Sequence, residues 1–136
     1  MMKWRLLSAA LAVGWTVCSA GTAGAQLAGQ TTVTSHIPNA RCMTLNLAPQ
    51  QMADPSVDIP VRATPRTDAP TIGSTGATVI VREGSLTNGF VEVMLANGRT
   101  GWMEANSLRP WAPRPGTQAT CRPAVLSNGR FGFDIR

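Results

Sequence analysis

The chain has 136 residues, of which 43% are hydrophobic, and its formal net charge is +5. Its basic residues are scattered, with no run of adjacent basic residues, whereas a nucleic-acid binder usually clusters them on one face and interleaves aromatic residues, so the composition argues against a nucleic-acid partner. We interpret the positive charge as that of an ordinary solvated protein surface. The alternative interpretation is that it attracts the protein weakly to an anionic polymer of the cell envelope.

Residues 1–25 have the three parts of a secretory signal: two basic residues, an apolar run over residues 6–20, and small residues up to Ala25. A helix that crosses a membrane needs about 18 to 20 apolar residues, and this run is shorter. We therefore predict cleavage after Ala25 rather than an uncleaved anchor. A lipoprotein at Cys18 is a third option, disfavoured because the residues before this cysteine do not suit lipidation.

Cleavage would leave 111 of the 136 residues, with ten arginines against seven acids and a net charge of +3. That length suits about one small domain. The exported protein is then expected to be periplasmic or secreted, without a stable membrane anchor. Its first part, residues 26–41, is polar and lacks periodicity, which predicts a flexible leader.

Residues 42–60 are predicted to form an N-terminal arm. Apolar and polar residues alternate over residues 43–47, which predicts a short strand with one buried face. Pro49–Met52 suits one helical turn. The prolines of residues 61–70 rule out a central ladder strand along that whole stretch and favour a long loop with extended edges.

Strands are next predicted at residues 78–82, 90–95, 99–103 and 108–109, where β-branched and apolar residues gather between turn signals. Asn97-Gly98 predicts a type I′ turn, in which both residues have positive φ. Residues 104–107 suit one 3₁₀ turn before the last strand. No segment shows a helical period longer than about two turns, so we predict an all-β fold.

Residues 110–120 are rich in proline and are predicted to be a stiff linker. Residues 121–136 predict a C-terminal hairpin around Asn128-Gly129. Because a lone hairpin is only marginally stable in water, we expect it to pack on the preceding strands or on the strand at residues 43–47.

Cys42 and Cys121 form an even pair in a chain expected to be exported, which predicts one disulfide. Closing a loop of this length stabilises the fold by roughly 4 kcal/mol in the chain-entropy model. The alternative is a reactive or metal-binding thiol. A metal site needs three or four ligands and the chain has one histidine, so we expect no metal.

Five short motifs follow one another in residues 61–108: Val-Arg-Ala-Thr-Pro, Ile-Gly, Gly-Phe-Val-Glu-Val, Gly-Arg-Thr-Gly-Trp-Met and a final leucine. In this order and spacing the stretch resembles the bacterial SH3-like (SH3b) domain family. The resemblance implies a small five-stranded barrel over residues 61–109, and the C-terminal hairpin predicted above is additional to it. It also implies a non-catalytic binding module that docks on peptidoglycan or its stem peptides.

The same resemblance implies a ligand groove formed by Asp68, Phe90, Trp102, Glu104 and Leu108. Both aromatic residues have an alternative role in the core, and both acids are alternatively ordinary exposed side chains. The chain contains no tyrosine, so the tyrosine-rich groove with which eukaryotic SH3 domains bind proline-rich peptides cannot be assembled.

Catalysis is the competing class of function. Wall peptidases that carry SH3b modules use a cysteine nucleophile and a histidine base, whereas here the cysteines are predicted to be paired and His36 lies in the predicted leader. No paired carboxylates and no glycine-rich phosphate loop are recognisable. We therefore expect no enzyme and no cofactor. The second hypothesis is an envelope adaptor, in which a protein partner covers the barrel and the hairpin adds to the partner's sheet.

Overall fold

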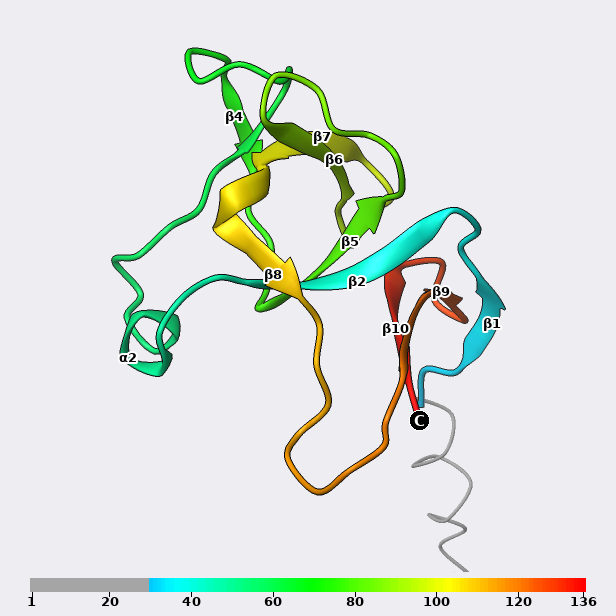
Figure 1. Ribbon diagram of the computed structural model, residues 1–136. Helices are drawn as coiled ribbons and strands as arrows, with labels where there is room; N and C mark the ends of the chain where they lie inside the picture. The colour runs from blue at the N-terminus through cyan, green and yellow to red at the C-terminus, as the bar shows by residue number, and fades with distance from the viewer. Residues whose placement is uncertain (1–29) are drawn as a thin grey trace, which may run out of the picture. The chain divides into compact units, whose positions relative to one another are not determined.

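The computed structural model describes residues 30–136, which form ten β-strands in two antiparallel sheets (Figure 1). The predicted signal and its cleavage point at Ala25 lie outside the described residues. The only helices within residues 30–136 are the single turn α2 (Pro49–Met52) and the 3₁₀ turn η1 (Ala105–Ser107). The predictions of an all-β fold and of these two turns are confirmed.

The larger sheet has seven strands. In spatial order they are β4 (Thr71–Gly73), β3 (Val61–Arg62), β7 (Thr100–Glu104), β6 (Phe90–Met94), β5 (Thr78–Arg82), β2 (Ala40–Leu45) and β8 (Leu108–Pro110). The strands wind around a common interior (Figure 1). The outermost strands β4 and β8 are not hydrogen-bonded to each other within the described residues, so the ladder of strands does not close, and it has seven members rather than five.

The smaller sheet has three strands, β1 (Val33–His36), β9 (Cys121–Leu126) and β10 (Phe131–Ile135), with β9 in the centre. The predicted C-terminal hairpin is therefore confirmed. The prediction of a flexible leader over residues 26–41 is wrong at β1, because Val33–His36 pairs with β9. That partner lies near the other end of the chain, so no local periodicity reveals the pairing.

Residues 42–60 were predicted to form an N-terminal arm with a short strand, outside the five-stranded barrel of residues 61–109. Instead β2 starts at Ala40, hydrogen-bonds to β5 along one edge and to β8 along the other, and so occupies the interior of the seven-stranded sheet. The sheet-forming unit thus begins about twenty residues before the stretch that carries the SH3b-like motifs. Residues 46–60, including α2, form an excursion between β2 and β3.

The interior of the seven-stranded sheet is filled by apolar side chains from six strands and from the residue that follows β6. They are Leu45, Val61, Val79, Val81, Val91, Val93, Leu95, Met103 and Leu108. Val79 and Val81 point into this cluster, yet Ile80 between them is also buried. Ile80 is in register with Cys42 and with Met94, and the three-stranded sheet covers this outer row. β5 is therefore buried on both faces.

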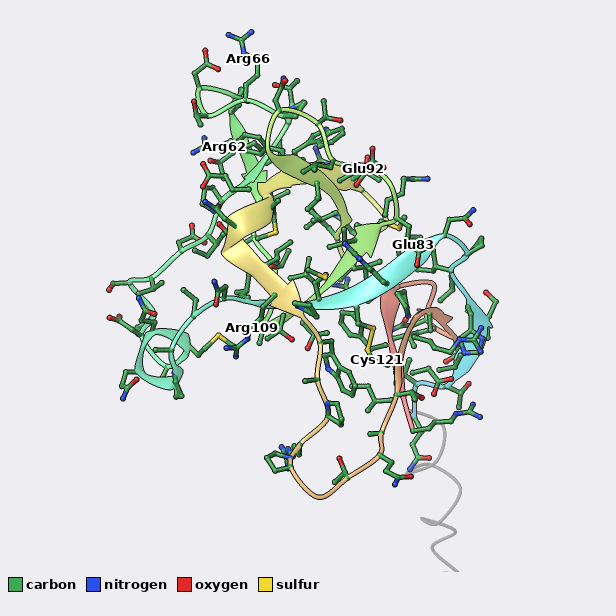
Figure 2. The ribbon with its side chains drawn as sticks, viewed as in Figure 1. Arg62, Arg66, Glu83, Glu92, Arg109 and Cys121 are labelled. Atoms are coloured by element: carbon green, nitrogen blue, oxygen red, sulfur yellow. A yellow bond between two sulfur atoms is a disulfide. The ribbon has the colours of Figure 1, made fainter. Side chains whose placement is uncertain are left out.

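The disulfide Cys42–Cys121 joins β2 of one sheet to β9 of the other, as predicted, with the two Cα atoms 6.1 Å apart. Figure 2 shows Cys121 beside the crossing of the two sheets. A structural disulfide is typical of a protein that folds in an oxidising environment outside the cytoplasm. Separately, no helix within residues 30–136 combines the length and the hydrophobicity required to cross a bilayer.

The hairpin turns differ from the prediction in one respect. At Asn97-Gly98 only the glycine has positive φ, and the Leu95 amide donates to the Arg99 carbonyl at 2.8 Å, so the loop has three residues. Such a loop is a type I turn followed by a left-handed residue, for which glycine alone is needed. The predicted type I′ turn is therefore wrong at this position.

Candidate functional site

Trp102 lies on the outer face of the seven-stranded sheet. Its neighbours Gly101 and Met103 are buried, whereas Trp102 is partly exposed, and successive side chains in a strand point to opposite faces. In the ladder Trp102 lies opposite Arg62 of β3 on one side and Glu92 of β6 on the other. The indole ring therefore has a cationic neighbour and an anionic neighbour in adjacent strands.

Glu92 is itself fixed by a second arginine. Arg82 Nε lies 2.6 Å from Glu92 Oε1, and the two residues belong to the neighbouring strands β5 and β6. On the other side, the Arg62 guanidinium donates to the Ala69 carbonyl at 2.9 Å, which holds the loop of residues 63–70 beside β3. Arg62 and Glu92 are labelled in Figure 2.

A groove of about 460 Å³ lies between this loop and the loop of residues 84–89. The residues that line it are Pro65, Arg66, Thr67, Asp68, Asn88 and Phe90. Phe90 is only 4% exposed and closes the groove from below, whereas Asp68 and Arg66 form an exposed ion pair at its mouth with 3.0 Å between Arg66 Nη2 and Asp68 Oδ2. The structure thus brings two predicted residues, Asp68 and Phe90, to one site.

The second wall of the groove is built by a tight turn. Thr87 and Phe90 exchange two backbone hydrogen bonds of 2.8 Å around Asn88-Gly89, and both central residues have positive φ. These are the features of a type I′ turn, which the sequence favours here because asparagine and glycine adopt such angles most easily. The Ser85 hydroxyl accepts from the Glu92 amide at 2.9 Å and so ties the loop back to β6.

The other predicted residues have different positions. Glu104 is in register with Phe90 on the same face, but it lines a separate cavity of about 170 Å³ together with Arg62. Leu108 is 7% exposed and belongs to the interior cluster, so it is not a groove residue. The sequence around Leu108 has no pattern that shows whether this side chain lies in the core or in a groove, because the strand that it starts is too short to show alternation.

Three residues of the site were not singled out from the sequence: Arg62, Glu92 and Asn88. Arg62 and Glu92 become visible only through strand register, because each is next to Trp102 in a different strand. Asn88 had a usable signal, since Asn-Gly between two apolar runs predicts a two-residue turn.

The described residues contain one further polar cluster, in the three-stranded sheet. His36 Nε2 lies 2.8 Å from Asp134 Oδ2, and Arg136 Nε lies 2.9 Å from Asp134 Oδ1. The hydrogen bond with His36, more than the one with Arg136, lowers the pKa of the Asp134 carboxyl below its usual 3.8. No group of three or more His, Cys, Asp or Glu side chains within residues 30–136 could hold a metal ion.

Comparison of this chain with protein-family models, with curated proteins and with solved structures finds no match.

Proposed function

We propose that this protein is an exported, non-catalytic binding module with an SH3-like barrel, and that it docks on peptidoglycan or its stem peptides. The fold part of this proposal is supported by strand order. Five strands lie in the order β8-β2-β5-β6-β7, a meander whose last strand returns beside its first, with η1 just before that last strand. This arrangement is typical of SH3-like folds, and residues 46–77 then correspond to the long loop between the first two strands.

The observation that carries the binding proposal is the partly exposed Trp102 between Arg62 and Glu92, on the same face of the sheet as Phe90, which lines the groove between residues 63–70 and 84–89. An exposed indole ring offers a flat apolar face to a sugar ring or a peptide. The flanking charges of both signs suit a stem peptide, which presents both carboxylates and an amine. The groove is shallow and open to solvent, with a volume of about 460 Å³.

Sedimentation with purified sacculi tests this function. The disulfide-bonded chain is expected to be retained in the pellet. Trp102→Ala is expected to weaken retention by about tenfold, because a central aromatic contact contributes roughly 1–2 kcal/mol or more to binding. Far-UV circular dichroism and a thermal melt should show that this variant stays folded, since Trp102 points away from the core.

Met52→Ala is the matched control. It also removes a partly exposed apolar side chain, 38% exposed on α2, but lies outside the groove, and its retention should equal that of the wild type. An unretained wild-type chain, or equal losses in both variants, would contradict wall docking. Absence of retention together with one co-purifying protein would favour the envelope adaptor instead.

A further inference from the structure

Within residues 30–136, β10 has a backbone edge without a partner strand. Thr120 and Arg136 exchange two backbone hydrogen bonds, of 2.7 and 3.1 Å, where the β9–β10 hairpin ends. In an antiparallel pair such hydrogen-bonded positions alternate with positions whose N–H and C=O groups point away. The backbone groups of Phe131, Phe133 and Ile135 therefore point away from β9.

Of these three residues, only Phe131 forms a backbone hydrogen bond on this side with another part of residues 30–136. The Phe131 amide donates to the Ala96 carbonyl at 2.9 Å, which confirms the outward direction. Within residues 30–136, the amides of Phe133 and Ile135 have no acceptor. β10 contains neither proline nor lysine, two residues that often protect edge strands, and its one charged residue, Asp134, is paired with His36 and Arg136.

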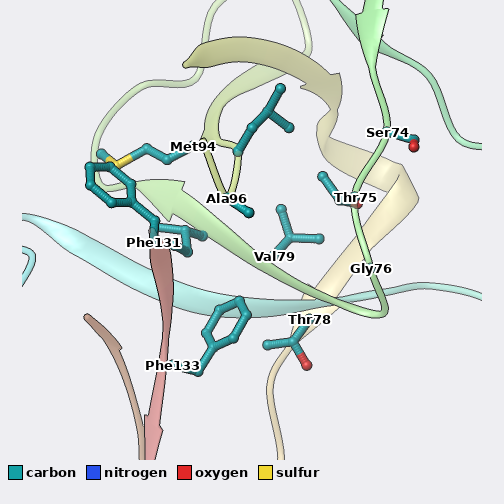
Figure 3. Close-up of a pocket in the computed structure, with 11 residues that line it drawn as sticks. Ser74, Thr75, Gly76, Thr78, Val79, Met94, Ala96, Phe131 and Phe133 are labelled. Carbon is teal, nitrogen blue, oxygen red and sulfur yellow. The ribbon is translucent and has the colours of Figure 1, made fainter. Parts of the chain in front are cut away.

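A cavity of about 170 Å³ lies between β10 and the segment 74–78 (Figure 3). Phe131, Phe133 and Met94 give it apolar walls. The Thr75 hydroxyl oxygen at this cavity is buried and has no hydrogen-bond partner among the described residues. A buried polar atom without a partner is uncommon in folded proteins.

A second cavity, of about 500 Å³, lies at the other end of the same edge, and Thr78 lines both. Its walls include Trp111, Pro113 and Ile135, so its lining is also largely apolar. Arg114 is the one charged residue among those that line the two cavities, and it belongs to none of the ion pairs within residues 30–136. The larger cavity therefore favours an anionic group.

We propose that this edge and its two cavities, here called the β10 groove, bind an extended, acidic peptide segment of a partner protein by strand addition. The peptide backbone pairs with the free groups of Phe133 and Ile135. One apolar side chain enters the smaller cavity, and an acidic side chain two residues away meets Arg114. Side chains two residues apart in a strand are about 7 Å apart, the same spacing as between Phe133 and Ile135 on β10.

This site is separate from the groove beside Trp102, and it goes beyond wall docking. The test is selection from a displayed library of random heptapeptides on the disulfide-bonded chain. Enriched peptides should carry an apolar and an acidic residue separated by one position, and binding should slow hydrogen exchange at the Phe133 and Ile135 amides. Ile135→Pro removes an edge amide that the β9–β10 ladder does not use, so the fold should persist.

Ile135→Pro should weaken the enriched peptides by about tenfold, since it removes a hydrogen bond and part of the apolar contact. Arg114→Glu should weaken them by about fivefold, whereas Arg130→Glu, at the tip of the hairpin, should not. Ile135→Pro should leave retention on sacculi unchanged, so that each site is tested without the other.

No enrichment, enrichment without the spacing pattern, or equal binding to Ile135→Pro would overturn the proposal. Concentration-dependent dimerisation through β10 would also overturn it, because the occupant would then be a second copy.

Discussion

Among the glycines of residues 30–136, Gly101 is the one at which an added Cβ atom would be most crowded. It faces the interior from β7, in the strand that displays Trp102 on the other side. A Cβ atom at this position would lie nearest to Val61 and only 3.1 Å from the Arg62 carbonyl oxygen. The backbone of β3 could not withdraw without breaking its pairing with β7. The absence of a side chain at Gly101 thus lets β3 approach and places Arg62 beside the indole.

Gly101→Ala is accordingly expected to lower the free energy of unfolding by about 1–3 kcal/mol, the usual cost of overpacking a core. Urea denaturation followed by tryptophan fluorescence measures it. Gly76→Ala is the matched control, because a Cβ there meets no atom within 4 Å, and its effect should be small. Similar losses in both variants would argue against close packing at β7.

We expect the stability of the three-stranded sheet to depend on pH through Asp134. Its pKa is lowered from 3.8, first by the hydrogen bond with His36. A carboxyl group whose pKa is lower in the folded than in the unfolded chain contributes stability that is fully present above the unfolded value and is lost as the pH falls through the folded value. The pairing of β1 with the C-terminal hairpin should therefore weaken in acid.

Asp134→Asn should flatten this dependence. Between about pH 5 and pH 2 the free energy of unfolding of the wild type should fall more steeply than that of the variant. Denaturant titrations across this range provide the measurement. Asp54, whose pKa is also lowered, by hydrogen bonds from Ser56, contributes equally to both proteins. Parallel profiles would show that Asp134 is not linked to folding.

At the scale of elements, the sequence predicted most strands after residue 70, because β-branched runs and turn residues alternate clearly there. It missed β1 and misplaced the start of β2, since both depend on partners distant in the chain. It also could not show that Ile80 is buried. A strand covered on both faces loses the alternation that distinguishes one face from the other.

The disulfide is the element-scale contact with the largest expected effect. Replacing both Cys42 and Cys121 by alanine should lower the free energy of unfolding by about 4 kcal/mol, because the unfolded chain regains the freedom of a long loop. Equilibrium denaturation of the variant, with the reduced wild type as a comparison, measures this. If reduction leaves the midpoint unchanged, the bridge does not constrain the unfolded chain.

For the molecule as a whole, the sequence anticipated part of the candidate site. Asp68 and Phe90 meet at one groove because the loop of residues 63–70 folds over β6, which the proline-rich composition only suggested. Trp102 lies on the outer face as the resemblance implied, but its charged neighbours depend on register across three strands. For the β10 groove, the sequence suggested only that the hairpin adds to a partner's sheet, because the two cavities beside β10 are lined by segments distant in the chain.

The disulfide between the two sheets determines what remains of the molecule after a protease cuts the chain. Cys42 and Cys121 are separated by 79 positions, and two largely exposed loops, residues 63–70 and 111–119, lie between them. A single cut in either loop would leave two fragments that remain one molecule, joined through sulfur. Such a clipped chain would migrate as one species until a reductant separates its halves, and the surfaces on both sides of the cut would stay tethered together.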